Sequence, residues 1–134
     1  MKTMLYDAPG YGNAWFESSN NCIYAHWDNM LTSKHMRPCC EAQLQAAIKN
    51  NAKAVIIDTA SAKGTPVLDD QKWFGDYLFP NLRKAGIKVI ITVLPKDALA
   101  KLGAKAWNKT GTMFDMDFIE VGSLAEAETQ ARKY

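Results

Sequence analysis

The chain has 134 residues, of which 48% are hydrophobic and 22% are charged. This composition is typical of one soluble globular domain with a real hydrophobic core. The net charge of +2 gives no reason to expect a nucleic-acid partner. No segment reaches membrane-spanning length, and the first residues lack the apolar centre of a signal peptide. We therefore expect a cytoplasmic protein, and three cysteines that cannot all pair with one another fit the same reduced setting.

The first part of the chain combines turn signals with two short strands. Pro9-Gly10 favours a turn, so we expect residues 1–13 to form a loosely held N-terminal arm. Residues 14–17 and 22–27 favour two short strands around a polar turn, which predicts a hairpin. The domain itself is expected to span residues 14–134.

The next segment has the pattern of an amphipathic helix that ends at Asn50-Asn51. Its apolar side chains recur at three- and four-residue steps, which marks one helical face. Thr32 or Ser33 can cap it. Pro38 is tolerated best in a first turn, so the regular helix is expected to begin there.

Two continuous apolar runs, residues 54–58 and 87–94, predict strands that are buried on both faces. Residues 118–121 predict a last strand. Three more helices are predicted, with start signals at Thr65-Pro66, at Pro95 and at Ser123. Ser123 and Glu126 have the spacing of a capping box, whereas Pro80 should kink or split the helix in which it lies.

Strands that alternate with helices predict an α/β fold. We expect a single mostly parallel sheet with an N-terminal hairpin and about four helices.

Several of these segments resemble the STAS-like family, which comprises the bacterial anti-sigma-factor antagonists and their SpoIIAA-like relatives. The resemblance covers roughly residues 15–134. The segments that carry it are Val55-Ile56-Ile57-Asp58, Trp73 with Leu78-Phe79-Pro80-Asn81-Leu82, Ala85-Gly86-Ile87-Lys88, Val93-Leu94-Pro95 and Ser123-Leu124-Ala125-Glu126-Ala127.

The resemblance implies a bacterial sheet-and-helix domain for protein contacts or for binding a small, lipid-like molecule. The phosphorylated members of the family carry the motif Asp-Ser-(Ser/Thr)-Gly, and the resemblance does not extend to it. The corresponding region reads Ser61-Ala62-Lys63-Gly64-Thr65-Pro66-Val67.

All three cysteines and both histidines fall between residues 22 and 40. Cys22 and His26 share a strand face, and His35 and Cys39 share a helix face. Two Cys and two His would suit a tetrahedral zinc site, and His35 beside Cys39 would suit a base with a thiol nucleophile. Packing of buried cysteines explains the same residues more simply, so we expect no metal and no cofactor.

The loop after residues 54–58 carries a second group of polar side chains. Asp58, Thr59 and Ser61 follow the carboxyl end of a central strand, where ligands of α/β sheets tend to bind. Ser61 and Thr65 are the candidate phosphorylation sites. The simpler interpretation is that these side chains cap and turn the chain.

The helix around Pro80 has aromatic residues on more than one face. Trp73, Tyr77 and Phe79, together with Asp58, Thr59 and Ser61, are therefore our candidate surface for a ligand or a partner. Such a surface also fits a homodimer. Asp69 and Asp70 are expected to be solvated.

We predict a non-catalytic domain that binds a protein partner or a small molecule. One alternative is an anti-sigma-antagonist phosphoswitch at Ser61 or Thr65. Another is a metal protein or an enzyme that uses residues 22–40.

Overall fold

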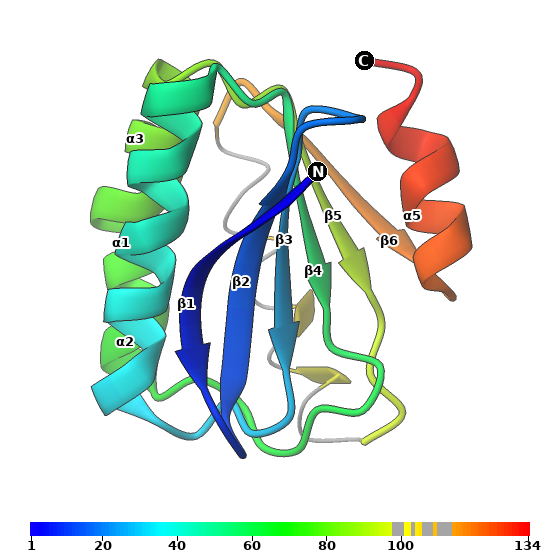
Figure 1. The fold of residues 1–134 in the computed structure, drawn as a ribbon. Coiled ribbons are helices and arrows are strands. Elements are labelled where there is room, and N and C mark those ends of the chain that lie inside the picture. The colour runs from blue at the N-terminus through cyan, green and yellow to red at the C-terminus, as the bar shows by residue number, and fades with distance from the viewer. Residues whose placement is uncertain (98–100, 103, 106–108, 110–113) are drawn as a thin grey trace.

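The computed structural model describes residues 1–97, 101–102, 104–105, 109 and 114–134. Six strands form one sheet, and they are β1 (Lys2–Ala8), β2 (Gly12–Glu17), β3 (Cys22–Trp27), β4 (Ala54–Asp58), β5 (Val89–Val93) and β6 (Asp117–Val121). The helical elements are α1 (Ser33–Asn50), α2 (Leu68–Trp73), the π-helical turn η1 (Phe74–Leu78), α3 (Phe79–Lys84) and α5 (Leu124–Ala131). Figure 1 shows the sheet with helices on both sides.

The strands lie in the sheet in the order in which they follow along the chain, from β1 to β6. β1, β2 and β3 pair in antiparallel fashion, whereas β3, β4, β5 and β6 pair in parallel. The fold is therefore α/β, and its sheet is mixed. The predicted hairpin is present as β2 and β3.

Residues 1–13 are not the loosely held arm that we expected. Lys2–Ala8 forms β1 and pairs along β2, so these residues belong to the sheet. Pro9-Gly10 does form a turn, in which the N–H of Tyr11 donates to the carbonyl of Ala8 at 2.9 Å. Gly10 has a φ of +84°, as the third position of a type II turn requires. The predicted turn is therefore present, but it connects the strands β1 and β2.

The helices divide into two unequal layers (Figure 1). α1 and the α2–η1–α3 segment cover one face, and the larger hydrophobic core lies between them and the sheet. α5 packs on the other face, over β4, β5 and β6, and encloses a smaller core. All five residues of β5 are buried, as expected for a strand covered on both faces.

Three helical segments cover the sheet within the described residues: α1 and α5 contact its strands directly, and α2–η1–α3 shares the larger core with it. The helix predicted after Pro95 falls partly on residues outside the described ranges. In the part of the chain that the structure describes, no helix combines the length and the apolar composition needed to cross a bilayer.

Pro80 does not break its helix, because the turn before it is a π turn. The N–H of Phe79 donates to the carbonyl of Phe74, which is five residues back. A proline in a regular helix loses one such bond and clashes with the preceding turn, and the wider turn provides room for the ring. The side-chain amide of Asn81 donates to the carbonyl of Tyr77 at 2.7 Å. The kink or split that we predicted at Pro80 is thus a single widened turn inside a continuous helical segment.

α1 begins at Ser33 and not at Pro38, because a tertiary contact holds its first turn. Asp70 of α2 is only 1% exposed, so it is not the solvated residue that we expected. Its carboxylate accepts hydrogen bonds from Ser33 Oγ at 3.1 Å and from Arg37 Nε at 2.8 Å. The helical turn that precedes Pro38 is therefore tied to the neighbouring helix.

Replacing Arg37 with Met should leave the Asp70 carboxylate buried with one hydroxyl partner. We expect the free energy of unfolding to fall by more than in the control variant below, since an unpaired buried charge is costly. Urea denaturation measures this change. Asp69→Asn is the control: it removes the other carboxylate that Arg37 contacts, which is exposed, and it should cost less than about 1 kcal/mol. Equal losses in the two variants would contradict the role of Asp70.

Candidate functional site

The carboxyl ends of β3 and β4 bring His26 and Asp58 side by side. The two strands pair in parallel in the register that places these residues opposite each other. Nδ1 of His26 lies 3.3 Å from Asp58 Oδ2, and Nε2 lies 3.0 Å from Asp28 Oδ1. The hydrogen bond to Asp58 is the main cause that raises the pKa of His26, and Asp28 adds to it. The same contact lowers the pKa of Asp58.

This arrangement engages both ring nitrogens of His26. As an imidazolium, the ring donates to two carboxylates and ties the end of β3 to β4 and to the following loop. In this geometry neither nitrogen is left to bind a metal ion or to accept a proton from a substrate. The cluster serves to hold the strand ends together.

The loop after β4 presents few of the polar side chains that we predicted as a ligand surface. Asp58 also accepts the N–H of Ala60 at 3.1 Å. Thr59 is fully buried, and its hydroxyl donates to the carbonyl of Val93 at 2.6 Å. Ser61 is exposed. The Thr65 hydroxyl oxygen is buried and has no hydrogen-bond partner within the described part of the chain. Of the two candidate phosphorylation sites, only Ser61 offers its hydroxyl to solvent.

The four Cys and His residues that we weighed as metal ligands lie in separate surroundings. Cys22 is buried in the core under α5, and His26 is bonded to carboxylates. His35 Nδ1 lies 2.8 Å from the Tyr6 hydroxyl. Cys39 is buried on α1, where burial raises the pKa of its thiol to about 11. In residues 1–97 and the described residues beyond them, no three His, Cys, Asp or Glu side chains form a group that could hold a metal ion.

The aromatic residues around Pro80 are less exposed than we predicted. The π turn brings Phe79 to the same side as Phe74, with ring centroids 5.9 Å apart, and Phe79 is only 2% exposed. Trp73 and Tyr77 stack on each other at 5.3 Å and remain half-buried. The Tyr77 hydroxyl donates to Glu41 of α1 at 3.1 Å. Most of this predicted surface therefore joins α2–η1–α3 to α1 or to the core.

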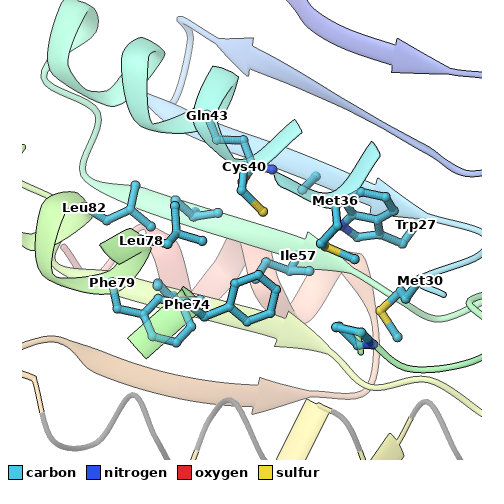
Figure 2. A pocket seen from close by; sticks show the side chains of 14 residues that line it. Trp27, Met30, Met36, Cys40, Gln43, Ile57, Phe74, Leu78, Phe79 and Leu82 are labelled. Atoms are coloured by element: carbon cyan, nitrogen blue, oxygen red, sulfur yellow. The ribbon is translucent and has the colours of Figure 1, made fainter. Parts of the chain in front are cut away.

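A cavity lies between the sheet and the larger helical layer (Figure 2). It is lined by Ala25, Trp27, Met30, Met36, Cys40, Gln43, Val55, Ile57, Pro66, Phe74, Leu78, Phe79, Leu82 and Ile90. The space that a water-sized sphere can occupy within it is about 40 Å³. Several elements meet here: α1 contributes Met36 and Cys40, the π turn contributes Phe74 and Leu78, β4 contributes Ile57, and β3, β5 and α3 complete the lining (Figure 2).

The sequence predicted the two apolar strands and the helical stripes that line this cavity. Met30 and Met36 were the available signal, because methionine often fills irregular spaces between packed elements. Phe79 was predicted as a surface residue and lies in the lining. The cavity itself follows from how the two helical segments pack on the central strands.

Comparison with family models, with curated protein sequences and with solved structures found no match to this chain.

The His26 contacts predict a pH-dependent stability. The folded pKa is raised above the unfolded value of about 6.5. The contribution is therefore complete below about pH 6.5 and is lost as the pH rises through the folded pKa. Urea denaturation between pH 6 and pH 9 should show a falling free energy of unfolding, and His26→Gln should remove this part of the slope. Asp58→Asn should reduce it, and a slope unchanged in both variants would contradict the assignment.

Proposed function

We propose that this protein binds a small apolar molecule in the cavity between the sheet and the α1 and α2–η1–α3 layer. The observation that carries the proposal is the lining of that cavity. Of the lining residues that the structure describes, twelve have hydrophobic or proline side chains, and Cys40 and Gln43 are the other two. Apolar linings with a few polar groups are typical of sites for small ligands.

The size of the cavity limits the ligand. A cavity needs roughly 10–15 Å³ of such space to hold one water molecule, and this one provides about 40 Å³. Apolar cavities stay dry and accept small hydrocarbons, because their lining offers water too few hydrogen-bond partners. The cavity as it stands in this structure therefore suits a compact ligand of a few non-hydrogen atoms. A longer apolar chain would require Phe74 or Leu78 to move.

The π turn is the place where such movement is easiest to accommodate. Single π turns in α-helices are frequent at functional sites. Here η1 contributes Phe74 and Leu78 directly to the lining, and Phe79 follows it. A shift of the widened turn would change the volume of the cavity without unfolding α2 or α3.

The chemistry of the lining favours a neutral ligand. Burial raises the pKa of the Cys40 thiol well above its usual value, so the thiol is uncharged at neutral pH. Gln43 is also neutral and is almost fully buried. Among the residues that the structure describes, no carboxylate, lysine or arginine lines the cavity, so a charged ligand would be buried there without a counter-ion at a high free-energy cost.

Two further considerations support a non-catalytic binding role. The resemblance to the STAS-like family implies domains that contact proteins or bind small, lipid-like molecules. The histidine and cysteine side chains of the enzyme alternative are also poorly placed for catalysis. The His26 nitrogens are bonded to carboxylates, and the pKa of the Cys39 thiol is raised.

A matched pair of substitutions on β5 tests the proposal. Ile90 lines the cavity, whereas its neighbour Ile91 faces the core under α5, and both are fully buried. Ile90→Val and Ile91→Val should each cost about 1 kcal/mol of unfolding free energy. Only Ile90→Val enlarges the cavity. Benzene in sealed cells should therefore raise the melting temperature of Ile90→Val most, and that of Ile91→Val no more than that of the wild type.

Benzene at ten times its Kd should add about 1.4 kcal/mol to the free energy of unfolding. Amide chemical shifts measured by NMR during the titration give an independent readout. They should change at Trp27, Phe74 and Ile90 and stay constant on the α5 side. A uniform response of the wild type and both variants, with no localised shift changes, would show that the cavity does not bind apolar molecules.

A further inference from the structure

β1 leaves one edge of the sheet open. It pairs with β2 on one side and ends the order of strands. Among the described residues, no backbone group bonds to its outer side. A strand in this position presents unpaired N–H and C=O groups, and a further strand can pair with them. The edge contains no proline and spans seven residues.

A groove runs beside this edge, on the side of α1. Leu5 of β1 and Phe16 of β2 contribute its apolar wall, and Ala42 and Ala46 of α1 lie on the opposite side. Its volume is about 370 Å³, far larger than that of the internal cavity. α1 packs beside β1 and β2 along this line (Figure 1). Ala42 and Ala46 are one helical turn apart, so they leave room on the same face of α1.

The groove is positively charged at one end. Lys49 is the single ionisable side chain among the described residues of its lining. It is exposed, and it forms no ion pair with any residue that the structure describes. It lies in the last turn of α1, and Thr3 near the start of β1 lines the same groove. A strand antiparallel to β1 would run toward this end.

We propose that the β1 edge and this groove bind an extended peptide segment of another protein. The segment adds to the sheet as a strand antiparallel to β1. Its alternate side chains, which are apolar, lie against Leu5 and Phe16 in the groove, because successive side chains of a strand point to opposite faces. A carboxylate at its carboxyl-terminal end, from an acidic side chain or from the chain terminus, lies near Lys49.

A flexible peptide fits this edge better than a second copy of the chain does. The register of β1 shifts between Met4 and Tyr6, which marks a β-bulge. Twofold pairing of β1 with itself along its full length is centred on Leu5 and would place the two bulges opposite each other, where the ladder of hydrogen bonds is already disrupted. A segment without structure of its own can follow the bulge. The charge of Lys49 selects a negatively charged end for that segment.

The test is selection from a library of random heptapeptides displayed with free carboxyl termini, using the complete chain as the target. We expect enriched peptides to alternate apolar with polar residues and to end in one or more carboxylates. The enriched sequences are then made with a fluorescent label, both as free acids and as C-terminal amides. Fluorescence anisotropy gives their Kd, and comparison of the two forms distinguishes a terminal carboxylate from a side-chain carboxylate.

Three variants locate the binding site. Ala42→Phe fills the groove from α1 and should weaken binding at least tenfold. Lys49→Gln should weaken it roughly fivefold, as expected for a partly exposed ion pair. Ile48→Phe adds the same aromatic ring as the first variant at a helical position that is 54% exposed and does not line the groove, and it should leave Kd unchanged. Circular dichroism checks that each variant is folded.

Two results would overturn the proposal. The first is a selection that enriches no peptide above background, or peptides whose Kd is the same for the wild type and folded Ala42→Phe. The second is a concentration-dependent dimer in analytical ultracentrifugation that Ala42→Phe disrupts, which would assign the edge to a second copy of the chain. The benzene experiment probes the internal cavity and is independent of both results.

Discussion

The burial of β4 and β5 on both faces is the constraint on which the rest of the structure depends. Every residue of β5 is buried, and the backbone of both strands is paired on each side. Such strands satisfy their polar backbone inside the sheet, but their side chains need a covering layer above and below. α1 with α2–η1–α3 provides one layer, and α5 provides the other.

The two helical layers differ in the space that they leave next to the sheet. α5 is short and covers the parallel half of the sheet closely. The opposite layer joins α1 to a helical segment that Pro80 interrupts, and the π turn before Pro80 sets how its side chains meet the sheet. The internal cavity and the groove beside β1 both lie on this side. The proposed functions therefore concentrate on the larger and less regular layer.

The charged side chains at the strand and helix ends have structural roles. The Asp70 carboxylate accepts hydrogen bonds from Ser33 and Arg37 and so holds the first turn of α1 against α2. The Asp58 carboxylate is hydrogen-bonded to His26, and this contact joins the ends of β3 and β4. In each pair the partners lie more than thirty residues apart in the chain. Charges engaged in this way join elements that are distant in the sequence.

Local sequence patterns determined the parts of the fold that depend on neighbouring residues. The continuous apolar runs predicted β4 and β5, and the capping box predicted the start of α5, where Ser123 Oγ accepts the N–H of Glu126 at 3.2 Å. Tertiary structure alone decided the pairing of β1, the burial of Phe79, the contact of His26 with Asp58 and the cavity. Each of these depends on which strands pair or on packing between distant elements, whereas a period of 2 or 3.6 residues defines only the buried face of a single element.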